Sequence, residues 1–219
     1  MAQHVKQVVV LGGTGYLGRP LIERLLRDGF QVAAVARPGS EAKLPPGCGV
    51  ITGNALDSRT YEDHIPPGAT LVHLVGTPHP APWKAPEFRS VDLVSLEQSV
   101  AAGKRAGAGH LVFVSVAHPA PVMRAFTKVR MECEQGIRES GLNAIILRPW
   151  YILGPGHYWP YILMPLYKIF ESIPATRESA LRLGLLRRPQ MVNALAAAVA
   201  SDARGISVVE TAAIRSCEA

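Results

Sequence analysis

The sequence is poor in cysteine, in aromatic residues and in charge. Charged side chains make up 18% of its 219 residues and aromatic side chains 6%. The three cysteines, Cys48, Cys133 and Cys217, are far apart and odd in number, so they predict neither a disulfide framework nor a paired-cysteine zinc site. The histidines do not have metal-ligand spacing either, so we expect no metal site.

Long unbroken hydrophobic runs are also missing. The longest uncharged runs, 65–83 and 149–167, are each interrupted by several prolines, which argues against a transmembrane segment. The N-terminus does not have the basic start, apolar stretch and cleavage site of a signal peptide, so we expect a cytoplasmic protein. The net charge of +6 comes mostly from scattered arginines, densest at Arg182, Arg187 and Arg188. Because no aromatic residues interleave with them, we expect no nucleic-acid partner, and a basic surface that attracts anions explains the charge.

Short apolar runs alternate with longer helical patterns along most of the chain, which is typical of βαβ units around a parallel sheet covered on both faces. Strands are expected at 8–11, 32–36, 50–52, 71–75, 111–114, 144–147 and 207–210, and helices at 17–27, 91–106, 122–140 and 190–201. The pattern predicts an α/β fold, a doubly wound parallel sheet of the Rossmann type. We expect one domain, 1–219, with a dinucleotide-binding core at 1–150 and a small C-terminal cap on the substrate side at 151–219.

A glycine-rich turn follows the first expected strand. Glycines stand at 12, 13, 15 and 18, between an apolar strand and an amphipathic helix. Such a turn needs Gly12 to bend tightly, Gly15 to let a pyrophosphate approach the backbone and Gly18 to let helix and strand pack closely. The phosphates then lie on free N–H groups at the positive end of the helix. The order strand, turn, helix, strand predicts a dinucleotide site rather than a structural turn.

The end of the second expected strand bears on the choice of cofactor. An NAD-preferring protein offers an acidic residue there to the ribose hydroxyls, whereas this chain has Arg37, which favours the 2′-phosphate of NADP. Ser40 and Lys43 are further candidates for this pocket, and a solvated arginine at a loop start is the alternative. After the third strand, Asn54 and Asp57 either face the adenine or form a polar turn. We therefore expect NADP as cofactor, with NAD as the second choice.

Several segments together resemble the atypical short-chain dehydrogenase/reductase family over about residues 5–155. They are G-G-T-G-Y-L-G, the Arg37 turn, G-N-A-L-D, L-V-F-V-S ending at Ser115, and E-S-G-L-N-A-I-I-L-R-P-W. The sequence is most similar to the NAD(P)H-binding, NmrA-like and epimerase-like members. The resemblance implies NAD(P) across the C-terminal edge of the sheet, contacted by Gly12, Gly13, Thr14, Gly15, Tyr16, Leu17, Gly18 and Pro149.

The sequence departs from this family in the catalytic element. Family enzymes carry Y-x-x-x-K on the helix after the serine strand, because the lysine lowers the pKa of the tyrosine that exchanges a proton with the substrate. The pair falls on Phe126 and Arg130 here, and a register with Lys128 as the lysine puts Arg124 at the tyrosine position. Neither register supplies a tyrosine. The resemblance then implies that Arg130 is a fixed cation near the nicotinamide ribose.

Other residues are candidates for the missing chemistry. Ser115 is placed to hydrogen-bond a carbonyl, and His118 is the titratable group nearest the expected nicotinamide edge, although a loop histidine is commonly just exposed. Tyr151 and Tyr158 are phenols on the substrate side that more often serve packing. The aromatic segment 150–170 is read three ways: core packing, an apolar substrate pocket, or a surface for a protein or membrane partner.

The leading expectation is an oxidoreductase that transfers hydride to a small apolar molecule without the Tyr-Lys pair. A non-catalytic NADP-binding regulator or assembly factor is the first alternative, and its support is the missing pair. A sugar-nucleotide epimerase or dehydratase is the second alternative, which the missing tyrosine and the short C-terminal part disfavour.

Overall fold

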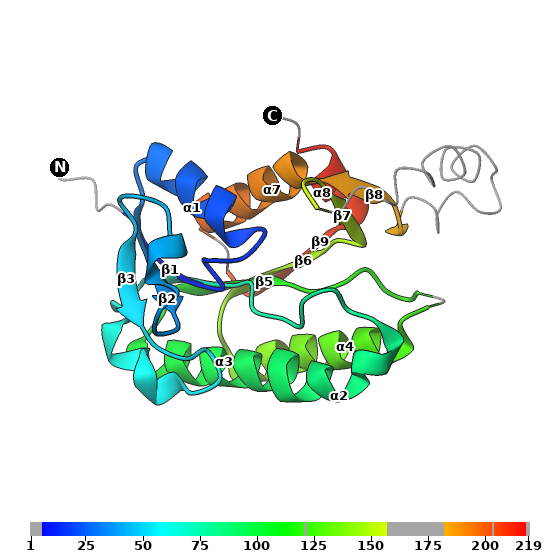
Figure 1. Ribbon diagram of the computed structural model, residues 1–219, viewed down its shortest axis with the longest axis horizontal. Helices are drawn as coiled ribbons and strands as arrows, with labels where there is room; N and C mark the ends of the chain where they lie inside the picture. The colour runs from blue at the N-terminus through cyan, green and yellow to red at the C-terminus, as the bar shows by residue number, and fades with distance from the viewer. Residues whose placement is uncertain (1–5, 121, 157–181, 203, 218–219) are drawn as a thin grey trace.

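The computed structural model describes residues 6–120, 122–156, 182–202 and 204–217. Its centre is a seven-stranded sheet in the order β3-β2-β1-β4-β5-β6-β9, in which every neighbouring pair is parallel (Figure 1). The strands are β1 (Gln7–Leu11), β2 (Gln31–Ala36), β3 (Gly49–Thr52), β4 (Thr70–His73), β5 (His110–Val114), β6 (Ala144–Arg148) and β9 (Ile206–Glu210). The strand order reverses between β1 and β4, which is the switch point of a doubly wound sheet. The predicted fold class is confirmed.

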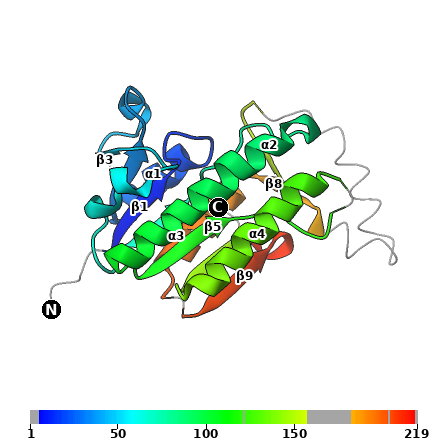
Figure 2. The same cartoon turned by 90° about the horizontal axis from the view of Figure 1, so that it is seen from below.

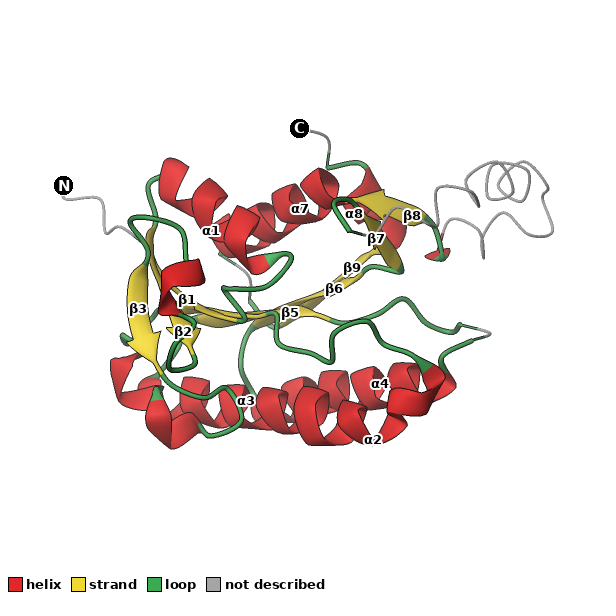
Figure 3. Cartoon of the chain, viewed as in Figure 1, coloured by secondary structure: helices red, strands yellow, loops and turns green. Residues whose placement is uncertain are grey.

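Helices cover both faces of the sheet (Figures 1 and 3). One face carries α1 (Gly18–Arg27), α7 (Arg188–Ala200) and the short α8 (Thr211–Arg215). The other carries α2 (Ala85–Glu87), α3 (Val94–Ala106) and α4 (Arg124–Ser140), and α3 and α4 run side by side along the strands in Figure 2. Val8 and Val10 of β1 belong to the core on the α1 side, and Val9 and Leu11 to the core on the α3 side. This division follows because successive side chains of a strand point to opposite faces.

The expected strands match the structure closely, with one informative difference. The sequence predicts the fourth strand at 71–75, but the strand ends at His73, although the Leu74 amide still donates to the Leu11 carbonyl at 2.9 Å. The ladder stops there because β1 ends at Leu11 and its chain turns away at Gly12, which has a φ of +88°. Residues 74–76 are thereby left as loop at the switch point, where a ligand is expected.

The helix expected at 91–106 begins earlier and contains a distortion. Helical structure runs through α2, a π-helical stretch η5 (Phe88–Leu93) and α3. The sequence also did not predict the two-stranded parallel sheet of β7 (Tyr151–Leu153) and β8 (Leu185–Arg187), because strands of three residues are too short to show a periodicity. Short 3-10 helices lie at η1 (Glu41–Lys43), η2 (Ser58–Thr60), η3 (Glu62–His64) and η4 (Pro82–Lys84).

Candidate functional site

The glycine turn lies between β1 and α1 at the switch point. The Gly15 amide donates to the Gly12 carbonyl at 3.0 Å, which closes the turn. A side chain on Gly12 would meet the Leu74 backbone at 2.9 Å, and one on Gly13 would meet Ala34 Cβ at 2.7 Å. A side chain on Gly18 would overlap the Gly12 carbonyl oxygen and the Gly13 backbone. The turn therefore requires glycine at these positions, as the sequence pattern indicates.

The N-terminus of α1 opens toward this turn. Among the described residues, no side chain caps the helix at Leu17, and its first turn contains no acidic residue. The Arg19 amide donates to the Gly15 carbonyl at 3.3 Å and Pro20 has no N–H, which leaves the Gly18 amide for a ligand, and the helix dipole favours an anion there. Leu17 itself packs against the α1-side core, so its part in the site is its backbone. The geometry fits a pyrophosphate.

A groove of about 410 Å³ runs along the carboxyl edge of the sheet from this turn. The glycine turn contributes Gly12, Thr14 and Gly15, the end of β2 contributes Arg37 and Ser40, and the loop after β3 contributes Asn54. The rest of the lining is mainly apolar: Val35, Ala36, Gly53, Ala55, Leu56, Leu74, Val75, Gly76, Pro78 and Val91. A mainly apolar groove with a cation in its lining suits the adenosine and phosphate groups of a dinucleotide. Lys43 lies in η1 and does not line the groove.

Asn54 and Asp57, paired in the sequence interpretation, form one turn in which the Asp57 amide donates to the Asn54 carbonyl at 2.8 Å. Asn54 lines the groove, while its Oδ1 accepts from the Leu56 amide at 3.1 Å. Asp57 begins η2, is absent from the groove lining and pairs with Arg59 at 2.9 Å. The hydrogen bond from the Arg59 side chain lowers the pKa of Asp57. The geometry favours the polar turn for Asp57 and a groove position for Asn54.

Arg130, which the sequence interpretation puts at the position of the family lysine, points into the protein. Its Nη2 donates to Asp92 Oδ1 at 2.6 Å and its Nη1 to the Val114 carbonyl at 3.0 Å, with the side chain 9% exposed. The guanidinium carbon lies 5.1 Å from the ring centre of Phe126, the residue predicted at the position of the family tyrosine. Asp92 is fully buried, and its Oδ2 accepts from the Thr77 amide at 2.9 Å and from the Thr77 hydroxyl at 2.6 Å.

This ion pair supports the wall of the groove. A side chain on Gly76 would overlap Arg130 Nη2, so the guanidinium packs directly against this groove residue. Arg130 and Asp92 thus hold the 76–77 loop on the side away from the groove, and Nη1 and Nη2 of Arg130 donate to protein groups. Its predicted contact with the nicotinamide ribose remains a prediction.

A second buried cluster gathers around Glu134 of α4. Its carboxylate accepts from Ser115 Oγ at 2.7 Å, Arg148 Nε at 2.9 Å and Arg138 Nη2 at 3.0 Å, and His118 Nε2 lies 3.4 Å away. Burial raises the pKa of Glu134, but the hydrogen bonds from Arg148, Ser115 and Arg138 outweigh it and lower the pKa to about 2. Glu134 is therefore a permanent carboxylate and not a general acid or base near neutral pH.

The cluster defines what Ser115 and His118 can do. Because Ser115 donates its hydroxyl hydrogen to Glu134, only its oxygen lone pairs remain for another partner. The His118 side chain is 15% exposed, and its Nε2 faces the Glu134 carboxylate. His73, in contrast, is fully buried between Ser95 and Ser99, and burial lowers its pKa to about 3. His73 therefore stays neutral near pH 7 and has no proton to give.

The remaining candidates lie away from the groove or outside the described residues. The buried Pro149 accepts from the Ala117 amide at 2.8 Å and joins the ends of β5 and β6 without lining the groove. Tyr151 begins β7, where its register partner is Leu185. Tyr158 and most of the aromatic segment, residues 157–181, fall outside the described residues. In the described part, no helix is long and apolar enough to cross a membrane, and no cluster of metal-ligand side chains occurs.

Two buried acids were not singled out by the sequence interpretation. Asp92 offers a weak signal, because it is a lone acid between apolar residues, V-D-L-V, on a helix. Glu134 gave no signal of its own, since it stands in a helix rich in charged residues. Each acid gains its role from an arginine on another element. Asp92 pairs with Arg130 of α4, and Glu134 accepts from Arg148 of β6.

The fold and the glycine turn define a dinucleotide-binding protein. Residues 12–163 match the model of the NAD(P)H-binding family, and the chain belongs to this family. Its cofactor is therefore a nicotinamide dinucleotide, and the resemblance to atypical short-chain dehydrogenases/reductases is confirmed.

Two curated relatives are similar over about two thirds of the chain. Ceramide reductase of Caulobacter vibrioides is 27% identical over 152 residues, which are 68% of this chain and 47% of that protein. 2-Alkyl-3-oxoalkanoate reductase of Stenotrophomonas maltophilia is 25% identical over 172 residues, with 68% of this chain and 52% of the relative covered. The chain thus spans about half the length of these relatives.

Solved structures share the fold at low identity. The Bordetella bronchiseptica enzyme WbmH, in complex with NAD+, superposes with a TM-score of 0.70 at 19% identity, over 94% of this chain and 76% of its own. UDP-glucose 4-epimerase of Thermus thermophilus, in complex with NAD, gives 0.66 at 17% identity, over 95% and 80%. These likenesses support the doubly wound fold.

Proposed function

We propose that the chain is an NADP(H)-dependent oxidoreductase that reduces a small apolar substrate. The observation that carries this proposal is the groove, in which Arg37 and Ser40 stand at the end of β2 and no carboxylate belongs to the described lining. An uncompensated guanidinium suits the 2′-phosphate of NADP, whereas the ribose hydroxyls of NAD call for an acid. The two curated relatives are both named reductases, which supports the reaction class.

Replacing Arg37 by alanine is expected to weaken NADPH binding by about tenfold to a hundredfold, because a charge-assisted phosphate contact is removed. NADH has no 2′-phosphate, so its affinity should stay nearly unchanged. Titration of both cofactors by fluorescence measures the two affinities. Equal weakening of NADPH and NADH would show that Arg37 shapes the loop and does not select the cofactor.

His118 is the proton donor in this proposal. A bound nicotinamide supplies a hydride to the substrate carbon, and the carbonyl oxygen then needs one proton. The imidazolium of His118 gives that proton and becomes neutral, and water restores it between turnovers. The Glu134 carboxylate lies 3.4 Å from His118 Nε2, and Ser115 donates a hydrogen bond to the same carboxylate. The buried His73 and the permanently ionised Glu134 are unsuited to this role.

His118→Gln should lower the rate of NADPH oxidation by a factor of at least about 100, the usual contribution of a general acid. The affinity for NADPH should not change, because His118 does not line the cofactor groove. The assay follows NADPH absorbance with a panel of apolar ketones and quinones. The exposed His64, in η3, provides a matched control as His64→Gln. Full activity of His118→Gln with an active substrate would remove His118 from the mechanism.

The non-catalytic alternative is supported by the resemblance, which puts Phe126 at the family's tyrosine position, and by the contacts of Arg130 with Asp92 and Val114. A wild-type protein that binds NADPH tightly but oxidises none of it across the panel would favour the regulator. A stoichiometric protein partner, recovered at native concentration, would then support that alternative directly.

A further inference from the structure

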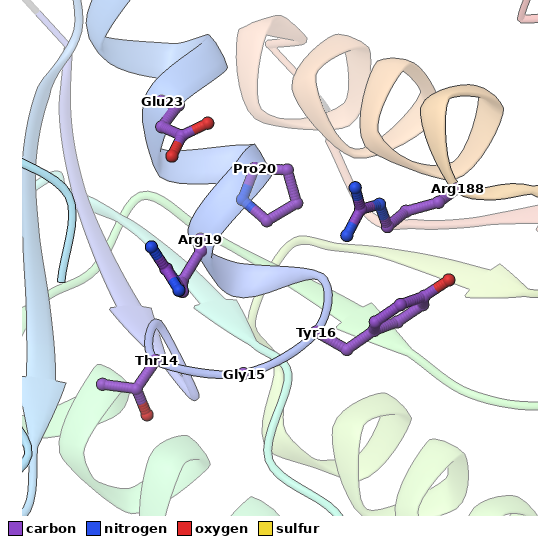
Figure 4. A pocket seen from close by; sticks show the side chains of 7 residues that line it. All are labelled: Thr14, Gly15, Tyr16, Arg19, Pro20, Glu23 and Arg188. Carbon is purple, nitrogen blue, oxygen red and sulfur yellow. The ribbon is translucent and has the colours of Figure 1, made fainter. Parts of the chain in front are cut away.

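A second cavity, of about 390 Å³, lies beside the glycine turn on the side of α7 (Figure 4). Its walls come from the turn, from the first turns of α1 and from Arg188, the first residue of α7. Thr14 and Gly15 line both this cavity and the dinucleotide groove. The two spaces therefore meet at the residues where a bound phosphate is expected.

Two arginines border this cavity from separate elements. Arg19 is the second residue of α1, and Arg188 reaches from α7 toward Pro20 in Figure 4. The Arg188 guanidinium carbon lies 5.2 Å over the ring centre of Tyr16, a residue of the glycine turn. Stacking on a ring holds the plane of a guanidinium while its N–H groups point outward at the edges. The Tyr16 ring thus holds the Arg188 guanidinium beside the glycine turn.

The charges of these arginines are not balanced by an ion pair in the described part of the chain. Several arginines of the helices are paired, among them Arg24 with Asp28, Arg89 with Glu132 and Arg105 with Glu62. Neither Arg19 nor Arg188 forms such a pair with a described carboxylate. Glu23 also lines the cavity, but it lies one helical turn further along α1 from the glycine turn.

We propose that Arg19 and Arg188 bind a phosphate group at the junction of the two cavities. Because Thr14 and Gly15 are shared, the source that the geometry favours is the pyrophosphate of the cofactor, held by the backbone on one side and by these side chains on the other. The other source of the same chemistry is a phosphorylated substrate. Binding of the cofactor pyrophosphate rests on the proposed function. The existence of a phosphate site at these two arginines does not.

The first arm of the test compares cofactor affinities. Arg19→Gln and Arg188→Gln should each weaken NADPH and NADH by the same factor, about tenfold, because both cofactors carry the pyrophosphate. This pattern differs from that of Arg37→Ala, which affects NADPH alone. Arg188→Lys keeps the charge but loses the planar fork and should fall between wild type and Arg188→Gln. Arg27→Gln removes the same charge from an exposed position of α1 and should leave both affinities within about twofold of wild type. Thermal melting confirms that each variant is folded.

The second arm uses inorganic phosphate as the probe, titrated into the full chain with and without saturating NADPH. If the site holds the cofactor pyrophosphate, wild type binds phosphate and NADPH abolishes the binding. If it holds a substrate phosphate, the NADPH-loaded wild type still binds phosphate, and loaded Arg188→Gln does not. Variants that match Arg27→Gln in both arms would overturn the proposed site. If the wild-type chain binds no nicotinamide cofactor, the proposed function is overturned instead. The phosphate site is then tested on the unloaded variants, and it requires that Arg27→Gln binds phosphate and that Arg188→Gln does not.

Discussion

Gly18→Ala is expected to abolish measurable NADPH binding. The added methyl group would overlap the Gly12 carbonyl oxygen and the Gly13 backbone, which are main-chain atoms that no side-chain rotation can move. The turn must then open or α1 must shift, and either change removes the N–H groups from the positions where a pyrophosphate can reach them. We expect affinity to fall by more than about a hundredfold, the loss of two or more charged hydrogen bonds. Fluorescence titration measures the loss, and overpacking should also lower the free energy of unfolding by about 1–3 kcal/mol.

Gly136→Ala is the matched control for this change. Gly136 lies within α4, and a side chain built there meets nothing within 4 Å. Alanine in a helix should stabilise the protein by about 0.5–1 kcal/mol without any effect on cofactor affinity. If Gly18→Ala bound NADPH as well as Gly136→Ala does, the phosphate site at the glycine turn would be ruled out.

Arg130→Met is expected to lower the free energy of unfolding by about 3–5 kcal/mol, because it leaves the carboxylate of Asp92 buried without its cation. Asp92 is completely buried, and the ion pair is formed at 2.6 Å. The effect should also reach the groove, since Asp92 holds the Thr77 amide and hydroxyl and Arg130 packs against Gly76. We therefore expect weaker binding of NADPH and NADH alike. Urea unfolding at pH 7 gives the stability change.

A double-mutant cycle separates the ion pair from the loss of side-chain volume. Adding Asp92→Asn to Arg130→Met removes the orphaned charge and keeps an oxygen that can accept from the Thr77 amide. The double variant should recover a large part of the lost stability. Arg138→Met on the same helix breaks a more exposed pair with Glu134 and should cost less than about 1 kcal/mol. Equal losses in Arg130→Met and Arg138→Met would contradict a supporting role for the buried pair.

The parts of the site that could be predicted from the sequence are those encoded within a few neighbouring residues. Gly12, Gly15 and Gly18 identify the phosphate turn because the strand before them and the helix after them are visible in the same short window. Arg37 was placed correctly at the groove for a similar reason, since the end of a strand of a parallel sheet always faces the same edge. Strand and helix periodicity is equally local. These features need no knowledge of what packs against them.

The sequence by itself therefore determined the doubly wound fold, the glycine turn and the position of Arg37, whereas the tertiary structure decided what the charged residues do. The resemblance puts Arg130 at the position of the family lysine, yet its guanidinium donates to the buried Asp92, 38 residues away. Arg188 looked like part of a basic cluster until the fold placed it over the Tyr16 ring. Ion pairing depends on which elements meet and how deeply the groups are buried, because the strength of a charge–charge contact is set by distance and by exclusion of water. Neither quantity exists until the chain has folded.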